Sequence, residues 1–458
     1  MSKDIHRPVL AVAVITAFIT TFTGSALNLS IPDIGAEFNV SAEAVGWLIT
    51  GYTLSVAAFS VPFGRMADMT ERRKILITGI AVFSVCCAAA FFSVSAFMIT
   101  AVRMIQGIGA AMIFSTNTAV LISSFPEENR GKVIGYSLAS TYAGLSSGPV
   151  IGGILNQNFG WRSIFILTGI LAVISFFIAW KKLPDEKSET GKSLLRKKNF
   201  DMKGNVLYIG FIVMLMYGLS EAASSTAGKA IAGAGMMLGI IFIRHEFIVD
   251  EPVVDVRLFR DNRGYAFSNL AALMNYGATF AVSYLISIYI QETAGYSSQT
   301  AGFIMAAQPL VMAAFSPLMG AVSDKVSPFK LASAGMGLCA AGTFIFIFVG
   351  EDTSVLVIII ALVVTGMGFA LFSSPNTNAV MSFVEEKNYG SASSILATMR
   401  SIGHTIGMVI VTITVNVYMD GVSLSQASSE SLIKVISTSF IIFTIICAAG
   451  IVFSLKRK

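Results

Sequence analysis

Charge is scarce in this chain. Only 12% of its 458 residues are Asp, Glu, Lys or Arg, and the mean hydropathy is +0.75. A soluble domain carries about 25% charged residues, and half that share cannot coat a water-soluble globule of this length. Apolar runs of roughly 20 residues recur along the chain, each long enough to cross a bilayer core of about 30 Å as a helix. The sequence is therefore that of an all-α polytopic membrane protein.

Histidine and cysteine are also rare, with 3 and 4 copies respectively. Each cysteine lies inside an apolar run without CxxC spacing, which argues against a disulfide framework or a zinc site. There is no Walker A loop, so ATP does not power the chain directly. No grouping of nucleophile, base and oxyanion donors is recognisable. An enzyme is the least favoured class, and we expect no metal and no cofactor.

The apolar runs predict fourteen membrane spans. They cover residues 9–29, 44–66, 75–93, 96–124, 132–155, 161–181, 203–221, 227–247, 264–291, 297–323, 329–349, 354–382, 390–418 and 433–455. The first run passes 20 residues without a clear small-residue cleavage site, so we expect it to be retained as a span and not removed as a signal peptide.

The distribution of basic residues predicts the orientation. With these spans, 26 of the 31 lysines and arginines fall on the side of the N-terminus. Only Arg162, Lys229 and Lys434 fall on the other side, while Arg103 and Arg400 lie within spans. The positive-inside rule then places both termini in the cytoplasm. We expect the membrane to be the plasma membrane. The net charge of +5 is explained by the basic residues on the cytoplasmic side. We therefore expect membrane lipids, and not nucleic acid, as partners.

An internal repeat relates the two ends of the chain. The segment 107–118 returns as 366–377, and Gly64 with Asp68 returns as Gly320 with Asp324. Parallel six-helix halves are a known transporter plan, with the substrate near the midplane where the halves meet. We expect an N-terminal half (1–182), a cytoplasmic linker (183–202), two inserted helices (203–247), a second linker (248–263) and a C-terminal half (264–458).

Three motifs carry a resemblance to a known family. Residues 64–74 read GRMADMTERRK, span four contains Arg103 and Gln106 before a glycine pair, and span five carries a glycine-rich pattern. Along its whole length the chain resembles the major facilitator superfamily, in particular its fourteen-span drug:proton antiporter branch. Glu71 stands where that branch usually has glycine. The glycine-rich pattern, similar to the antiporter signature, consists of Gly144, Gly148, Pro149, Gly152 and Gly153.

The first motif predicts a conformational latch. Its members are Gly64, Asp68, Arg72 and Arg73, with Asp324 as the repeat. An aspartate can cap a helix N-terminus, and arginines can reach carboxylates or helix C-termini. The alternative is an ordinary basic anchor at the membrane surface. For the antiporter motif, glycines four apart on one helix face allow close backbone contact.

Proton coupling is implied by the resemblance, but its usual carboxylate is absent. Thr23 stands where the first span of the family carries an aspartate, although Asn28 and Pro32 match the end of that span. The coupling candidates are Arg103, Gln106, Glu221, Arg400 and His404. The resemblance associates Arg103 with coupling, while a structural arginine bonded to backbone carbonyls is the alternative. A lone helical histidine such as His404 is more often structural.

A substrate cavity without a carboxylate suits neutral, zwitterionic or weakly charged amphiphiles. Its candidate residues are Thr23, Asn28, Asn117, Asn275, Tyr284, Gln308 and Asn376. We expect a monomeric efflux transporter for small amphipathic compounds or drugs, working by alternating access with protons as the coupling ion. Two alternatives stay open: an exporter of an endogenous lipid or metabolite, and a transport-dead sensor with the same fold.

Overall fold

The computed structural model describes residues 3–28, 30–40, 42–183, 200–221, 225–296, 298–419 and 428–456, and within these ranges it contains helices and no strand. The helices are α1 (Lys3–Asn28), α2 (Ile31–Phe38), α3 (Ala42–Met69), α4 (Arg72–Phe91), α5 (Ala96–Ser124), α6 (Arg130–Phe159), α7 (Arg162–Lys182), α8 (Met202–Glu221), α9 (Thr226–Ile248), α10 (Val256–Asp261), α11 (Arg263–Ile288), α12 (Ser298–Met305), α13 (Ala307–Ser323), α14 (Pro328–Phe346), α15 (Val355–Ser382), α16 (Tyr389–Met419) and α17 (Ser429–Leu455). The predicted all-α class is confirmed.

All fourteen predicted spans coincide with helices, but apolar length alone supports thirteen of them. Thirteen helical segments of the described ranges are long and apolar enough to cross a membrane. The remaining helix, α6, has 30 residues yet is not among the thirteen. Glycine and serine are frequent along it, and together with Asn156, Gln157 and Asn158 near its end they dilute its apolar content. The count of fourteen thus depends on the placement of α6 inside the bundle.

One predicted span is broken in the structure. Residues 297–323 were expected as a single helix, whereas α12 ends at Met305 and α13 begins at Ala307. Pro309 explains the break, because it has no N–H to donate to the carbonyl of Met305 and its ring crowds that carbonyl. Two further helices were not predicted. They are α2, which carries proline in its first turn, and α10, which is capped by Asp255 and lies within the linker 248–263.

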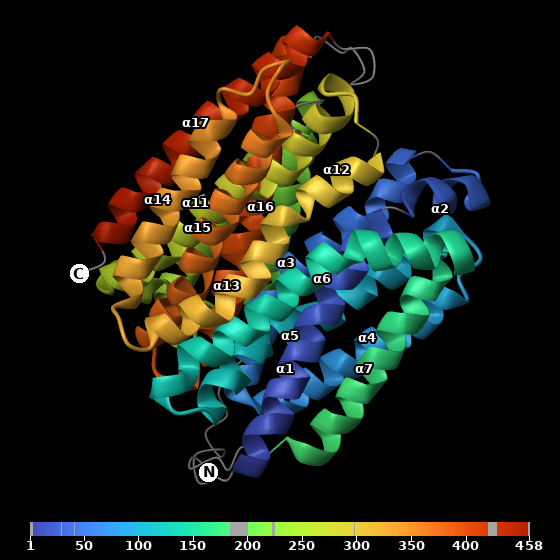
Figure 1. The fold of residues 1–458 in the computed structure, drawn as a ribbon. Helices are drawn as coiled ribbons and strands as arrows, with labels where there is room; N and C mark the ends of the chain where they lie inside the picture. The colour runs from blue at the N-terminus through green and yellow to red at the C-terminus, as the bar shows by residue number, and fades with distance from the viewer. Residues whose placement is uncertain are drawn as a thin grey trace.

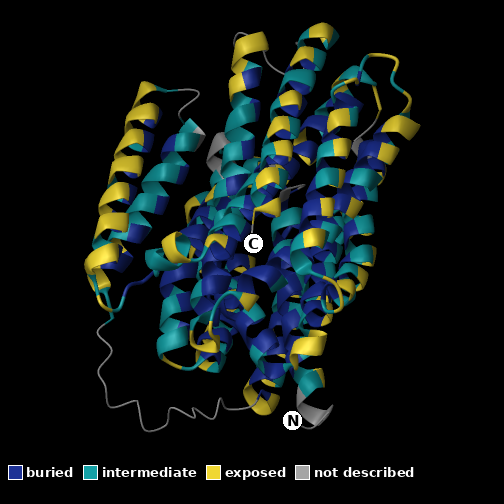
Figure 2. Ribbon diagram, turned by 90° about the vertical axis from the view of Figure 1, so that its left-hand side faces the viewer, coloured by how far each residue is buried: buried dark blue, intermediate teal, exposed yellow. Residues whose placement is uncertain are grey.

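The two halves lie side by side as helical bundles (Figure 1), the first coloured blue to green and the second yellow to red. Each half has a large apolar core, built in the first around Phe22, Phe83 and Phe165, and in the second around Phe372 and Phe440. Exposed residues cover the outer surfaces of the helices, whereas buried ones gather toward the middle (Figure 2). Large apolar side chains on a helix surface are expected where lipid is the solvent.

The inserted helices α8 and α9 pack on the first half and also reach the second. Apolar side chains of α3 and α8 share one cluster, which also holds Ile395 of α16. The hydroxyl of Tyr208 in α8 lies 3.2 Å from the Ala57 carbonyl oxygen and 2.8 Å from the Thr398 hydroxyl. The insert therefore contacts both halves through one tyrosine.

Candidate functional site at the interface of the two halves

Asp68 caps a helix that belongs to the other half. Its carboxylate accepts hydrogen bonds from the backbone N–H groups of Gly390 at 2.7 Å and Ser391 at 2.6 Å, in the first turn of α16. The first N–H groups of a helix have no partner inside it, and the helix dipole favours a negative charge there. The Asp68 side chain is only 1% exposed. The end of α3 is thus fastened to the start of α16 across the interface.

Asp324 makes the same contact in the opposite direction. Its carboxylate accepts from the backbone N–H groups of Gly131 at 2.6 Å and Lys132 at 3.0 Å, in the first turn of α6. Burial raises the pKa of the Asp324 carboxyl, and these two N–H groups oppose that rise. The sequence repeat has therefore become a pair of reciprocal helix caps. We call the end of the bundle that holds these two caps the basic face, since Arg72, Arg73 and Lys325 lie beside them.

The two arginines of the first motif have different partners. Arg72 forms an ion pair with Asp68 at 3.3 Å and donates to the backbone carbonyl of Glu386 in the other half. Arg73 donates to the backbone carbonyl of Trp180 at 2.7 Å, in the last turn of α7. Cations at a helix C-terminus are stabilised by the dipole. One arginine thus links the halves, and the other fastens α4 to α7 within the first half.

Glycines allow the halves to approach closely at this face. A Cβ atom on Gly64 would lie 2.6 Å from the Gly390 carbonyl oxygen and would overlap the side chain of Ser394. Gly131 and Gly320 face one another, so that a Cβ on either would overlap the carbonyl oxygen of the other. No residue larger than glycine fits these positions without moving the helices apart. The halves are therefore in close contact at these two places of the basic face.

Aromatic side chains continue the interface toward the middle of the bundle. The hydroxyl of Tyr142 in α6 donates to the Ser373 hydroxyl at 3.0 Å, and that of Tyr276 in α11 lies 3.1 Å from the same oxygen. The Phe369 ring packs edge-on against both tyrosines. Tyr142 belongs to the first half and the other three to the second, so this cluster closes the interface above the basic face.

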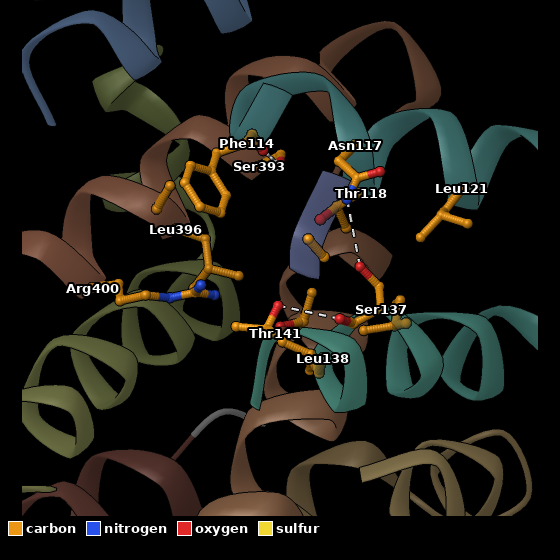
Figure 3. A pocket seen from close by; sticks show the side chains of 14 residues that line it. Phe114, Asn117, Thr118, Leu121, Ser137, Leu138, Thr141, Ser393, Leu396 and Arg400 are labelled. Carbon is orange, nitrogen blue, oxygen red and sulfur yellow. Dashed lines mark hydrogen bonds between the residues drawn. The ribbon is translucent and has the colours of Figure 1, made fainter. Parts of the chain in front are cut away.

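A cavity lies between the halves beside this cluster (Figure 3). It is lined from the first half by Ala17, Phe114, Asn117, Thr118, Leu121, Ile134, Ser137, Leu138 and Thr141, and from the second by Thr377, Ser393, Leu396, Ala397 and Arg400. Asn117 donates to the Ala13 carbonyl at 3.2 Å and to the Ser137 hydroxyl at 3.5 Å. The Ser393 hydroxyl donates to the Phe114 carbonyl at 3.1 Å across the interface. In alternating access, a cavity lined by both halves is the place where a bound substrate would be exposed first to one side of the membrane and then to the other.

Of the predicted cavity residues whose side chains are described, Asn117 lines this space and the others do not. Thr23 is buried and donates to the Ile19 carbonyl of its own helix at 2.6 Å. Asn275, Gln308 and Asn376 are buried within the second half, and Asn376 donates to the Ser268 carbonyl at 3.3 Å. Tyr284 is 40% exposed on the bundle surface. The side chain of Asn28 lies outside the described residues.

Arg103 is fully buried among neutral partners. It donates to the Gln106 side-chain oxygen at 2.5 Å and to the Leu48 carbonyl at 3.3 Å, and its guanidinium lies 4.1 Å from the centre of the Tyr52 ring. One of its terminal nitrogens has no hydrogen-bond partner. Arg103 and Gln106, both coupling candidates, therefore act as one unit, which ties α5 to α3 in the first half.

The other coupling candidates lie apart from one another. The His404 ring stacks on Phe280 at 4.0 Å and meets the Tyr276 ring edge-on at 5.6 Å. It lies one helical turn from Arg400, which lines the cavity. Glu221 lies at the end of α8 in the insert, packed against Gly228, and does not line the cavity. Position thus favours His404 over Glu221 as a group that could sense the state of the cavity.

The glycines of the antiporter motif bring α6 against α1. A Cβ on Gly144 would lie 2.7 Å from the Phe18 carbonyl oxygen, and one on Gly148 would lie 2.5 Å from the Ser25 side chain. Gly152 faces Ala26 in the same way, whereas Gly153 is half-buried. Nothing is described for the side chain of Pro149. Close backbone contact is what the spacing of four predicts.

Replacing Gly148 with valine is expected to lower transport at least about tenfold and to lower the melting temperature, because the added atoms overlap α1 and overpacking costs about 1–3 kcal/mol. Purified protein in detergent gives the melting temperature and proteoliposomes give the flux. Gly24→Val is the matched control, since a Cβ on Gly24 of α1 meets nothing within 4 Å. Equal behaviour of the two variants would contradict the close-contact role.

The sequence analysis missed a polar cluster in the insert. Asp201, His245 and Glu246 place their ligand-type atoms within 4.8 Å of one another. His245 lies 2.9 Å from the Asp201 carboxylate, and the fully buried Glu246 accepts from the backbone N–H of Val254 at 2.6 Å. In the sequence, only Glu246 at the end of the predicted span 227–247 and Asp201 in the linker 183–202 could have indicated this cluster. The cluster joins α8 to α9 and holds the segment that follows α9.

The comparisons with known proteins agree with this architecture. The sequence profile of the Major Facilitator Superfamily matches residues 13–249 and 268–458. The riboflavin transporter RibZ of Clostridioides difficile is 26% identical over 399 residues, covering 87% of this chain and 86% of RibZ. The multidrug resistance protein Stp of Mycobacterium tuberculosis is 27% identical over 389 residues, covering 84% of this chain and 71% of Stp.

Two further similarities are informative. The methylenomycin A resistance protein of Bacillus subtilis is 24% identical over 411 residues, covering 88% of this chain and 86% of that protein. Among solved structures, the human organic anion transporter MFSD10 superposes with a TM-score of 0.65 at 12% identity, covering 97% of this chain and 99% of that one. At that identity the likeness shows the fold alone.

Proposed function

Since this chain belongs to the Major Facilitator Superfamily, we propose that it is a secondary active efflux transporter for small amphipathic compounds, of the fourteen-span drug:proton antiporter branch. It lies in the plasma membrane with both termini in the cytoplasm, works as a monomer and exchanges its substrate for protons. Relatives whose names describe drug resistance support the direction of transport.

The reciprocal caps are the observation that carries this proposal. Asp68 and Asp324 each bind the first turn of a helix in the opposite half, and both contacts lie on the basic face. For a substrate to enter the central cavity from that face, both caps must open together. A device of this kind favours one of two arrangements of rigid halves, which is what alternating access requires. A sensor that does not transport would not need two equivalent helix caps that can open between the halves.

The cavity supports an amphipathic substrate. Its described lining combines rings and aliphatic side chains, such as Phe114 and Leu396, with amides and hydroxyls, such as Asn117 and Ser137. No carboxylate is among the described residues that line it. Sites of this composition bind an apolar body and orient it through a few polar groups.

A second candidate function is export of an endogenous metabolite. The similarity to a riboflavin transporter over most of the chain favours it, because that relative is named for a vitamin and not for a drug. The fold and the caps would serve either substrate equally, so the two functions differ only in what the cavity binds.

Flux into proteoliposomes tests the transport function. We expect uphill movement of at least one dye under an imposed pH gradient, using ethidium (cationic), dansylamide (neutral) and N-dansylglycine (anionic), with an imposed membrane potential at fixed pH as the comparison. A His404→Gln variant is expected to lower the pH-driven flux about tenfold, and Glu221→Gln to leave it within about twofold. Absence of movement of all three dyes under both gradients would reject the transporter.

A further inference from the structure

Arg400 is a charged side chain that extends into the cavity. It belongs to α16, and its guanidinium lies between Leu396 of its own helix and Thr141 of α6 (Figure 3). Both halves of the protein therefore surround it. A substrate bound at this place would contact the side chain whenever the cavity is occupied.

The charge of Arg400 is not matched by a carboxylate. No Asp or Glu of the described ranges forms an ion pair with it, and its Nε atom is buried without a hydrogen-bond partner. Its one described stabilising contact is the face of the Tyr276 ring, 4.9 Å from the guanidinium carbon. An arginine near the middle of a membrane helix costs about 2.5–3.5 kcal/mol on insertion scales, and such residues are usually paired.

Arg103, the other arginine within the spans, donates to hydrogen-bond acceptors that belong to the protein. It is fully buried and donates to a glutamine side chain and a backbone carbonyl, although one of its terminal nitrogens has no hydrogen-bond partner. It is not among the described residues that line the central cavity. Arg400 lacks such neighbours and faces open space instead. The contrast indicates that the partner of Arg400 is not part of the protein.

The rest of the lining defines what that partner must be. Arg400 is the only ionisable group among the described residues around the cavity. Thr118, Ser137 and Thr141 contribute hydroxyl groups to the lining, while Phe114, Leu138 and Leu396 provide apolar surface. A single cation with hydroxyl donors matches one anionic group, and the apolar walls match a hydrophobic body attached to it.

We propose that Arg400 binds the anionic group of the substrate, and that the substrates are organic monoanions with an apolar body, such as aryl or alkyl carboxylates. This inference deepens the proposed transport function and rests on it. The guanidinium supplies two parallel N–H donors, which a carboxylate accepts as a fork. The bound anion would form an ion pair with the Arg400 guanidinium at the interface of the halves. His404, one turn further along α16, lies outside the lining.

Three dansyl dyes that differ in charge provide the test. N-dansylglycine is an anion, dansylamide is neutral and dansylcadaverine is a cation, while the fluorescent body is the same in all three. We expect purified full-length protein in detergent to bind N-dansylglycine most tightly and dansylcadaverine most weakly, as measured by fluorescence anisotropy. Equal affinity for the three dyes, or no binding of the anion, would overturn the proposal.

Variants then assign the preference to Arg400. Arg400→Gln is expected to weaken the binding of N-dansylglycine at least about tenfold and to leave that of dansylamide within about twofold. Arg400→Lys is expected to retain part of the preference because it keeps the charge but not the fork. Lys330→Gln, which removes an exposed positive charge from the basic face, is the control and should bind all dyes like the unmodified protein. An unchanged preference in Arg400→Gln would reject the assignment.

The same experiments separate this inference from the transport function. Binding of the anion that depends on Arg400, without movement of any dye under either gradient, would reject transport and keep the site. Pumping of ethidium or dansylamide without preferential binding of N-dansylglycine would do the reverse. Should Arg400→Gln fail to fold, competition on the unmodified protein decides: benzoate should displace N-dansylglycine, and benzylamine should not.

Discussion

Replacing Asp68 with asparagine is expected to lower transport about a hundredfold while the protein still inserts and folds. The asparagine keeps the shape of the side chain but loses its charge, and its amide nitrogen faces a backbone N–H that is itself a donor. Asp68 accepts two N–H bonds from α16 and pairs with Arg72, with almost no exposure to water. Loss of one charge-assisted bond and a clash of donors together cost about 3 kcal/mol, or roughly a hundredfold in a population.

The measurement is initial flux in proteoliposomes, together with the reactivity of a cysteine placed in the cavity lining toward a reagent added at the basic face. Asp68→Asn is expected to raise that reactivity, because the caps hold this face closed. Asp324→Asn serves as the internal comparison, and we expect a smaller loss of about tenfold, since the Asp324 carboxylate is less deeply buried than that of Asp68. A variant at Asp68 with normal flux and normal accessibility would show that the cap is only an anchor.

Replacing Arg103 with methionine is expected to lower transport by a similar factor. Arg103 donates to Gln106 and to the Leu48 carbonyl, and its removal leaves the buried side-chain oxygen of Gln106 without its donor. An unsatisfied buried polar group costs about 1–3 kcal/mol. Arg103→Lys is expected to recover only part of the activity, because lysine cannot lie flat against Tyr52 while donating to two separate acceptors.

Two readouts decide which role Arg103 has. A structural arginine predicts that Arg103→Met lowers the melting temperature and slows every form of transport equally. A coupling arginine predicts that substrate counterflow at equal pH continues while uphill, pH-driven transport is lost. The geometry favours the structural role, because Arg103 has neutral partners inside one half and is not among the described residues that line the central cavity. Preserved counterflow with lost uphill transport would contradict that reading.

The central cavity shows where prediction from the sequence stopped. Of the residues predicted for the cavity, Asn117 lines it, whereas Thr23, Asn275 and Tyr284 do not. Arg400 also lines it, but the sequence had indicated this arginine only as a coupling candidate. The faces of one membrane-spanning helix can point toward lipid, toward neighbouring helices of the same half or toward the opposite half. The sequence does not show which face points toward the opposite half. Thr23, for example, satisfies its hydroxyl on its own helix and needs no neighbour.

The sequence by itself determined the fold class, the repeat and the kinds of contact that its motifs could make. The scarcity of charge required membrane helices, and the paired aspartates at equivalent positions of the two halves indicated two helix caps. Those conclusions rest on hydropathy and local chemistry, which a linear chain already contains. Only the tertiary structure decided that each aspartate caps the opposite half, that Arg103 has neutral partners within the first half, and that Arg400 faces a cavity without a counter-ion. Those facts depend on how helices distant in sequence rotate and pack, because burial and pairing are properties of neighbours in space.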